Sequence, residues 1–594
     1  MSSPLPEAYA RAYLALARAA LERDGGGDDK ATGAAPLPQP APPPPVGARR
    51  VVLSAWRAGQ AYVETANGPT FADGVRKAAA AMAMAHPDAA AGRLEIDVPT
   101  VVDRAGSEIV DEDMEVAQPS LGLEGVLVTR DDGKTGVVLP GDIVRQGMFR
   151  SGRLDHARIG DLLAERAAVG RSELGSMRAY RFRADTHVET PGHDGALAVV
   201  RGMVAPPDAV TPEALLARVR RGADYLLRVM GPSGRYVYLY RPLDDRDDPS
   251  YGWLRHAGTT YALLEAYEEF RTPAYLEKAE LALSYLSSHL TRDAAGGGRY
   301  VLDTDDEEQQ KVGGAGLSLL AMAEHAAVTA RHDGAELETM RDLARFIIKQ
   351  QYEDGHFRSN ADVERENGGR KLKREPVYYP GEAVLSLVRL YGIDPQPAYL
   401  EAARKGADYV VNVRDAYVSE DNQEHDHWMS YALGDLYRLT RDEAYLKHAY
   451  KIARAILKKQ RRAGDAPAPD FAGTFYDGQI TPASTRLEAY DADIALSRFA
   501  GRADAWLLEP AVEVARSILG QQFDPLDDYW LRNPAKADGG VRESLFVQDV
   551  RIDYVQHAMS AWLHLARLLR DPGRDKAGAA VVGEQGAAAA PAQR

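Results

Sequence analysis

Acidic, basic and aromatic residues stand where several helical segments of this chain are expected to begin. The sharpest group is Arg551-Ile552-Asp553-Tyr554-Val555-Gln556-His557, in which Asp553 and His557 are four residues apart. This spacing places both side chains on one face of a helix, so the carboxylate could orient or charge the imidazole as an acid/base pair. Gln556 lies at the edge of that face, and Arg551 could bind a uronate or another anion. The alternative is an internal Asp–His salt bridge that only stabilises the helix.

Further carboxylates could complete a site for glycoside hydrolysis, which normally requires a pair. Glu382 falls in the first helical turn after Pro380, where it could also serve only to stabilise the helix N-terminus. Glu488 and Asp491 are three residues apart on another helical segment. Because the sequence gives no distance between these groups, retaining and inverting mechanisms both stay open. We predict Asp553, His557, Glu382 and Glu488 as the catalytic residues.

The remaining candidates are suited to hold a carbohydrate, because sugar rings stack on aromatic faces and sugar hydroxyls need polar partners. The residues expected to bind substrate are Arg255, His256, Tyr379, Asp426, His427, Trp428, Tyr490, Asp491, Arg551 and Gln556. His425 and His427 could equally be solvated loop residues. They lack the i, i+4 spacing of a helical zinc site, and the chain has no cysteine. We therefore predict no metal site and no cofactor.

Paired helices must position these residues. Four segments begin alike, with Tyr275-Leu276, Tyr399-Leu400, Tyr445-Leu446 and Trp506-Leu507, and each continues with apolar residues on one helical stripe. A second set of apolar helical segments alternates with them and precedes most of them. This second set lies at 258–270, 314–325, 380–391, 427–439, 486–499 and 552–569. With outer helices near 215–230 and 337–352, about twelve helices result, repeating at roughly sixty residues. We predict an all-α (α/α)6 toroid of six hairpins over residues 205–572, whose inner helices begin at one common mouth. A tetratricopeptide solenoid, the competing fold, repeats every ~34 residues without long loops.

Three segments at this mouth carry a family resemblance. Arg255-His256-Ala257-Gly258-Thr259, Lys311-Val312-Gly313-Gly314 and Tyr379-Pro380-Gly381-Glu382-Ala383 resemble the six-hairpin glycosidase-like superfamily. The resemblance implies a glycoside hydrolase, a uronate lyase or a sugar epimerase. A third reading, isoprenoid cyclisation, is disfavoured: the stretch from Gln351 to Phe357 is similar to a terpene-cyclase turn, but no Asp-x-Asp-Asp motif follows. The glycines at 313–316 more plausibly let helices approach closely than bind phosphate.

The N-terminal third has a different texture. We predict a helix at 1–24, a Pro/Gly-rich linker at 25–49, an α+β domain at 50–192 and a disordered tail at 573–594. Asp131-Asp132-Gly133-Lys134 should join two strands as a hairpin. The succession Gly68-Pro69-Thr70-Phe71-Ala72-Asp73-Gly74-Val75, the strand at 94–98, the stretches at 122–126 and 136–140 and the strand Tyr180-Arg181-Phe182-Arg183 resemble the AMME chromosomal-region protein family over about 46–192. The resemblance implies a small α+β fold.

Composition narrows the possible partners. The formal net charge is −15, which repels phosphate backbones and argues against nucleic acid as a partner. No apolar run is long enough to cross a membrane, and the mean hydropathy is −0.36. The N-terminus lacks a signal-peptide pattern, so we expect a cytoplasmic protein. We predict a carbohydrate-active enzyme that acts on a sugar or another small polar substrate. The alternative is a non-catalytic glycan- or peptide-binding protein whose N-terminal domain recruits a protein partner.

Overall fold

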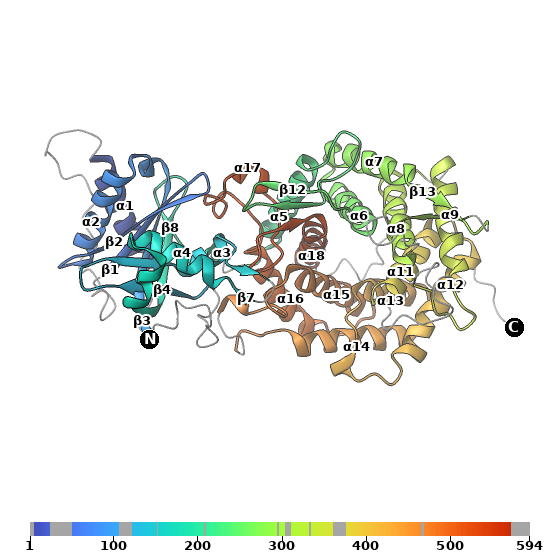
Figure 1. Ribbon diagram of the computed structural model, residues 1–594. Helices are drawn as coiled ribbons and strands as arrows, with labels where there is room; N and C mark the ends of the chain where they lie inside the picture. Colours follow the sequence, from blue (N-terminus) through green and yellow to red (C-terminus); the bar gives the residue numbers. More distant parts are fainter. Residues whose placement is uncertain are drawn as a thin grey trace.

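The computed structural model describes residues 5–23, 50–105, 122–150, 153–206, 209–293, 296–302, 311–331, 334–359, 376–464 and 469–571. A ring of helices lies beside a smaller domain built on a sheet (Figure 1). The predicted linker and the predicted C-terminal tail lie outside the described residues.

The N-terminal domain is an antiparallel sheet with helices packed on it. Its strands are β1 (Arg50–Arg57), β2 (Gln60–Asn67), β3 (Arg93–Ala105), β4 (Glu124–Thr129), β5 (Thr135–Val138), β8 (Arg178–Glu189), β9 (Ala196–Val200) and β10 (Met203–Val204). They run in the order β10-β9-β8-β3-β1-β2, and β4 also pairs with β8 and carries β5 at its other edge. The sheet therefore continues past the predicted boundary at residue 192.

Local sequence explains the elements of this domain. The hairpin predicted at 131–134 joins β4 to β5, where Thr129 lies opposite Thr135. Helix α2 (Phe71–Ala85) begins with a capping box: the Thr70 hydroxyl accepts a hydrogen bond from the Asp73 backbone, and the Asp73 carboxylate accepts one from the Thr70 backbone. Helix α1 (Glu7–Arg23) packs on α2 and on the sheet. The predicted N-terminal helix is thus part of the same domain.

Twelve of the described helices form two concentric layers. The inner helices are α6 (Trp253–Phe270), α8 (Val312–Thr329), α11 (Tyr379–Ile393), α13 (His427–Thr440), α15 (Ile480–Phe499) and α18 (Ile552–Arg570). The outer helices are α5 (Pro212–Arg228), α7 (Pro273–Ser288), α9 (Gly334–Lys349), α12 (Pro397–Tyr409), α14 (Glu443–Lys459) and α16 (Ala505–Leu519). Each inner helix contacts the next, and α18 returns to α6. The predicted six-hairpin ring is confirmed.

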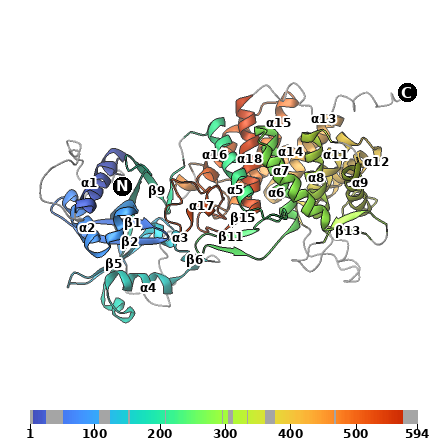
Figure 2. The same ribbon diagram turned by 90° about the horizontal axis from the view of Figure 1, so that it is seen from above.

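The connections explain why one end of the ring gathers the polar residues. Inner helices pass to outer helices through short turns, such as the one between α6 and α7, where Arg271 adopts a left-handed backbone. Outer helices return to inner ones through long segments, which span 229–252, 289–311, 350–378, 410–426, 460–479 and 520–551. The described parts of all six long segments therefore lead into the N-terminal end of the inner layer, which we call the mouth (Figures 1 and 2).

Glycines allow the inner helices to approach one another. A Cβ at Gly316 of α8 would lie 3.0 Å from the backbone of Glu382 in α11, and one at Gly258 of α6 would lie 2.6 Å from the Gln556 side chain in α18. The expectation that the glycines at 313–316 permit close helix packing is confirmed. These contacts bring the first turns of the inner helices within reach of each other.

The N-terminal domain packs against the last long segment, 520–551. Arg145 donates a hydrogen bond to the Tyr529 hydroxyl, Arg93 donates to the Pro525 carbonyl at 3.2 Å, and the Val204 N–H donates to Asp527 at 2.8 Å. This segment then enters α18. The domain therefore supports the stretch of chain that delivers Arg551, Asp553 and His557 to the mouth.

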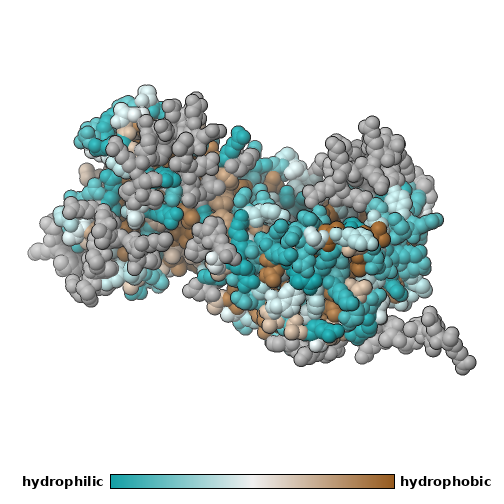
Figure 3. Space-filling model, turned by 90° about the horizontal axis from the view of Figure 1, so that it is seen from below, coloured by the Kyte–Doolittle hydropathy of each residue, from teal (hydrophilic) through white to brown (hydrophobic). Residues whose placement is uncertain are grey.

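The surface of the ring is mostly hydrophilic on the face shown in Figure 3. Within the described parts of the chain, none of the helices has the length and apolar character that crossing a bilayer would require.

Candidate active site

Two histidines and a glutamate from three inner helices meet at the mouth. His427 is the first residue of α13, Glu488 lies in α15 and His557 lies in α18. His557 Nδ1 is 2.8 Å from Glu488 Oε2, and His427 Nε2 is 3.8 Å from the same oxygen. The two imidazole rings are nearly perpendicular, with centroids 5.3 Å apart. All three side chains had been predicted at the site, but not as one cluster.

The surroundings of this cluster favour proton transfer. Burial lowers the pKa of His427 well below its usual range, and electrostatic interactions with His557 and Arg486 lower it further. Neither ring nitrogen of His427 has a hydrogen-bond partner. Burial raises the pKa of Glu488, and its interaction with His557 opposes that rise. His427 is therefore a neutral base at neutral pH, and Glu488 fixes the orientation of His557.

The partner of Asp553 differs from the prediction. Its carboxylate accepts hydrogen bonds from Arg551, at 2.6 and 2.9 Å, and from Arg255 of α6, at 3.1 Å. The acid/base pair expected from Asp553 and His557 is therefore corrected: His557 pairs with Glu488, and Asp553 pairs with two arginines. These arginines hold the pKa of Asp553 below its usual value despite its burial. Arg255 and Arg551 are still partly exposed, with side-chain exposures of 42% and 25%.

Glu382 and Asp426 form a second pair of carboxyl groups at the mouth. Burial, with the charge of Asp426, raises the pKa of Glu382 to about 8, and burial raises the pKa of Asp426 to about 7. Asp426 caps α13 by accepting a hydrogen bond from the Met429 N–H at 3.1 Å. One oxygen of each group, Oε2 of Glu382 and Oδ2 of Asp426, is buried without a hydrogen-bond partner. At neutral pH, Glu382 therefore carries a proton that it could donate.

Arg486 of α15 lies on the same side of the mouth as His427. Its Nε donates to His425 Nδ1 at 2.9 Å, and a terminal nitrogen donates to the Pro482 carbonyl at 2.8 Å. The Tyr378 ring packs edge-on against His427 at 5.3 Å, and the charge of Arg486 acts on both groups. Our prediction did not include Arg486, Tyr378 or His425 among the site residues. All three residues lie beside predicted starts of inner helices, and this position could have marked them as site residues.

Several predicted binding residues face the protein interior instead. His256 is fully buried between the Tyr251 hydroxyl, at 2.6 Å, and the Ala282 carbonyl, at 3.0 Å, and burial lowers its pKa to about 4. Tyr490 is also fully buried and donates its hydroxyl proton to Gln460. The predicted substrate contacts of His256 and Tyr490 are therefore corrected, because side chains on the outward face of an inner helix meet the outer layer.

The other predicted residues stay near the ring interior. Gln556 packs against Gly258 where α18 meets α6. Asp491 is buried, burial raises its pKa, and neither of its oxygens has a partner. Trp428 lies under His427, with ring centroids 4.6 Å apart, and is almost completely buried. Tyr379 is the first residue of α11, beside Gly313. Trp428 therefore supports His427 from beneath, and its burial leaves little of its face for a sugar.

The histidine cluster also offers a ligand set that the sequence did not predict. One ligand atom each of His427, Glu488 and His557 lies within 4.8 Å of the others. Two imidazoles and a carboxylate are ligands for zinc or iron. The absence of a metal site stays a prediction.

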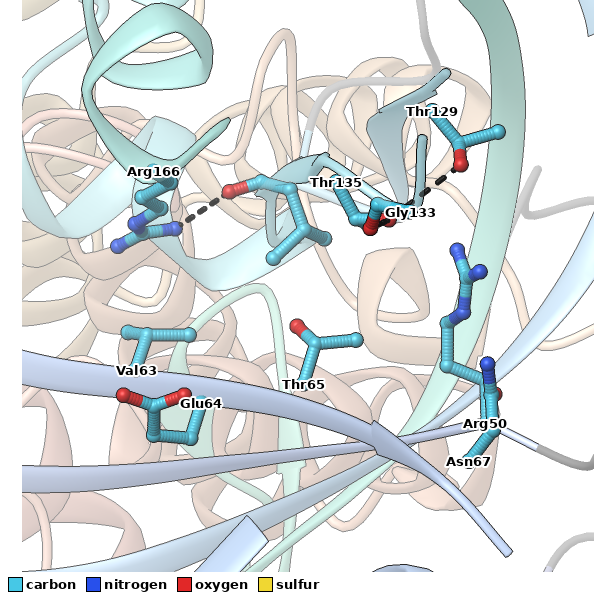
Figure 4. Close-up of a pocket in the computed structure, with 10 residues that line it drawn as sticks. Arg50, Val63, Glu64, Thr65, Asn67, Thr129, Gly133, Thr135 and Arg166 are labelled. Atoms are coloured by element: carbon cyan, nitrogen blue, oxygen red, sulfur yellow. Dashed lines mark hydrogen bonds between the residues drawn. The ribbon is translucent and has the colours of Figure 1, made fainter. Parts of the chain in front are cut away.

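The N-terminal domain contains a separate polar pocket of about 290 Å³ between β2 and the β4–β5 hairpin (Figure 4). Arg50 points toward Thr129 of the hairpin, and Glu64 lies at the opposite end (Figure 4). Burial lowers the pKa of Arg50 and raises that of Glu64. The pocket lining includes hydroxyl groups and two cations, Arg50 and Arg166, but neither a histidine nor a pair of carboxylates. The mouth of the ring is therefore the better candidate for chemistry.

Comparisons with known proteins concern the ring. No protein-family model matches the chain, and no curated protein matches it. Solved structures with some similarity include an α-mannanase of glycoside hydrolase family 76 from Bacteroides thetaiotaomicron, with a TM-score of 0.45, 13% identity and coverage of 60% of this chain and 96% of the mannanase. A D-mannose isomerase has a TM-score of 0.45 and 15% identity, and the match covers 60% of this chain and 97% of the isomerase. A cellobiose 2-epimerase from Bacillus thermoamylovorans has a TM-score of 0.44 and 14% identity, and the match covers 60% of this chain and 100% of the epimerase. The similarity of residues 46–192 to the AMME chromosomal-region family stays a prediction.

Proposed function

We propose that the ring is a carbohydrate-active enzyme that transfers a proton at a sugar carbon, as epimerases and isomerases do. The observation that carries this proposal is the pair His427 and His557, two imidazoles 5.3 Å apart of which one is neutral and unpartnered and the other is anchored to Glu488. Histidine is well suited to exchange protons near neutral pH. The partly exposed Arg255 and Arg551 offer donors for sugar oxygens at the entrance.

The proposed reaction begins with a ring-opened aldose. The hydrogen on C2 is acidic because the C1 carbonyl can take up the electron pair as an enediolate. A nitrogen of His427 removes this proton, and the C–H electrons form the C1–C2 double bond. His557 donates Nδ1–H to Glu488, takes up a proton from solvent at Nε2 and delivers that proton to the intermediate. Delivery of this proton to C2 from the other face gives the epimer. Delivery to C1, with transfer of the O2 hydroxyl proton to O1, gives the ketose.

Arg255 and Arg551 have a supporting role in this proposal. Their hydrogen bonds to Asp553 fix both guanidinium groups at the start of α18. Nitrogen atoms outside these bonds can donate to the carbonyl oxygen on which negative charge develops. Asp553 is thus a positioning residue, because it acts through the arginines.

The test is deuterium incorporation. The protein is incubated in deuterated water with a panel of aldoses and uronic acids, and proton NMR follows the C2 signal. Loss of that signal, with new epimer or ketose signals, is expected for the wild type and not for His427→Gln. Enzyme that releases reducing ends without deuterium at any carbon would overturn the proton-transfer proposal.

A second candidate function is glycoside hydrolysis. It is favoured by Glu382, a buried carboxyl group with a pKa of about 8, next to Asp426. A protonated carboxyl beside a second carboxyl is what acid-catalysed cleavage of a glycosidic bond requires. In this case Glu382→Gln should abolish the release of reducing ends from oligosaccharides, whereas His427→Gln should leave it within a few-fold of wild type.

The non-catalytic alternative predicts binding without turnover. A glycan or peptide would then give saturation-transfer signals but no change in its spectrum over days. In that reading the N-terminal domain, with its AMME chromosomal-region resemblance, recruits a protein partner. A pull-down with the full chain as bait would then recover a protein partner.

A further inference from the structure

One buried arginine at the mouth has no acidic partner. Five described arginines are less than 9% exposed, and four of them pair with a carboxylate: Arg145 with Glu95, Arg201 with Asp470, Arg498 with Asp504 and Arg542 with Asp527. Arg486 is 6% exposed and forms no ion pair with any described residue. Because an uncompensated buried charge is costly, its presence calls for a reason.

The contacts of Arg486 do not neutralise its positive charge. Its three hydrogen bonds go to the neutral groups His425, Pro482 and the Tyr476 hydroxyl, the last of them long at 3.4 Å. Burial lowers the pKa of Arg486, and the groups that oppose this are tyrosine hydroxyls. The terminal nitrogen that faces Tyr476 is the one whose hydrogen bonding is least complete.

Tyr476 lies at the surface next to this nitrogen. Its side chain is 60% exposed, and its backbone lies in the left-handed region, with φ of 49°, which is uncommon for a tyrosine. The Arg486 guanidinium stands 5.4 Å from the centre of its ring. Tyr476 therefore lies between Arg486 and bulk water, where a ligand could reach both.

The other charges of the mouth do not neutralise Arg486. Arg255 and Arg551 share the single carboxylate of Asp553, which leaves an excess of positive charge. Burial raises the pKa of Glu382 and Asp426 to about 8 and 7, so neither contributes a full negative charge at neutral pH. Among these six groups positive charge is therefore in excess, although the chain as a whole carries a net charge of −15.

We propose that Arg486 binds an anionic group of the substrate, which is therefore an acidic sugar bearing a carboxylate or a phosphate. The Tyr476 hydroxyl supplies a second donor to the same group. This inference rests on the proposed function for the identity of the ligand as a sugar. It differs from the expectation drawn from the sequence, in which Arg551 would bind the anion.

Calorimetric titration of the full chain tests the proposal. The probes are matched sets: glucose with glucuronate and glucose 6-phosphate, and mannose with mannuronate and mannose 6-phosphate. We expect the wild type to bind one acidic class at least tenfold more tightly than the neutral sugar. Comparison of the carboxylate and phosphate members identifies which anion is bound.

Variants assign this preference to Arg486. Arg486→Gln should remove it, and Arg486→Lys should retain part of it because the charge remains. Arg502→Gln, which removes an exposed charge paired with Glu443 near the end of the same helix, serves as the control and should leave affinities unchanged. Equal affinity for acidic and neutral sugars in the wild type, or equal loss of both in Arg486→Gln, would overturn the proposal.

Deuterium exchange on the same sugars separates the two proposals. Acidic sugars that bind through Arg486 without exchanging any C–H proton would refute the proton-transfer function and leave the anion site intact. Exchange on neutral sugars, with no gain from an acidic group, would refute the anion site and leave the proton-transfer function intact.

Discussion

The N-terminal domain and the mouth of the ring treat buried charge in opposite ways. In the domain, buried carboxylates meet arginines, as in the pairs Glu95–Arg145, Asp142–Arg166 and Glu189–Arg18. Asp97 is an exception, but its carboxylate accepts a hydrogen bond from Thr186 at 2.6 Å. At the mouth, Arg486, His427 and Glu382 keep nitrogen or oxygen atoms without a charged partner. Paired charges of the first kind hold the fold together, whereas we propose a ligand-binding role for those at the mouth.

The opposite end of the ring follows the pattern of the N-terminal domain. Glu265 of α6 lies 2.9 Å from His564 and accepts a hydrogen bond from Ser560 at 2.6 Å. Arg389 of α11 donates to Asp435 of α13 at 2.7 Å. These groups join neighbouring inner helices. Asp493 of α15 is an exception, because both of its oxygens are buried without a hydrogen-bond partner. Unpaired groups are therefore found at the mouth but are not confined to it.

Loss of a histidine at the mouth should have the largest effect on activity. His427→Gln is expected to lower proton exchange at the sugar carbon by about 10²–10⁴-fold, because it removes the base. Melting temperature should change little, since neither nitrogen of His427 bonds to the protein. His448→Gln is the matched control: His448 is also buried in the ring but bonds to Asp415, so the control should lose stability and keep activity in the folded fraction.

Two arginine variants test the comparison directly. Arg145→Met should lower the free energy of unfolding by about 3–5 kcal/mol, because Glu95 would remain buried without its partner. Arg486→Met should leave that free energy unchanged or raise it by about 1 kcal/mol, because no carboxylate is abandoned. Denaturant titration of both variants measures the difference. Similar losses in the two would show that Arg486 is a structural residue.

The raised pKa of Glu382 should make the free energy of unfolding depend on pH. The folded protein holds the carboxyl proton up to a pKa of about 8, whereas the unfolded chain releases it near 4.5. The contribution of Glu382 is therefore fully present below about pH 4.5 and is lost as the pH rises toward 8. Glu382→Gln should match the wild type near pH 4.5 and exceed its stability by up to about 4–5 kcal/mol at pH 8, since each pKa unit corresponds to about 1.4 kcal/mol.

Denaturant unfolding at the two pH values measures this effect. Glu401→Gln, at an exposed position of α12, is the control and should follow the wild type at both. A Glu382→Gln variant that loses stability at pH 8 would mean that the ionised carboxylate supports the fold.

Removal of metal ions should have the smallest effect on the proton-exchange rate. If His427 and His557 act as bases, treatment with a chelator should leave the exchange rate within about twofold. Added Zn²⁺ should inhibit, because it would occupy the nitrogens of His427 and His557. Activity that disappears with the chelator and returns with one divalent ion would replace the two-base mechanism with a metal-assisted one.

The pattern of residues along the chain determined the ring and the place of its mouth. Repeated helical stripes and long polar connections fix which helices are inner and which end gathers the loops. Helical periodicity also explains why Glu488, His427 and His557 were among the candidates, since each follows the start of an inner segment. The same periodicity misled for His256 and Tyr490, because it does not tell which face of an inner helix meets the outer layer.

Pairing between helices was decided only by the tertiary structure. Asp553 and His557 share a helical face but do not pair with each other. Asp553 binds Arg551 and also Arg255, which lies nearly three hundred residues earlier in the chain. His557 pairs with Glu488. The electrostatic attraction between these groups depends on distances that no local spacing contains. The lack of a carboxylate beside Arg486 is likewise visible only when every neighbour is in place. The sequence alone determined which residues reach the mouth, and the packing of six inner helices decided which of them remain unpaired.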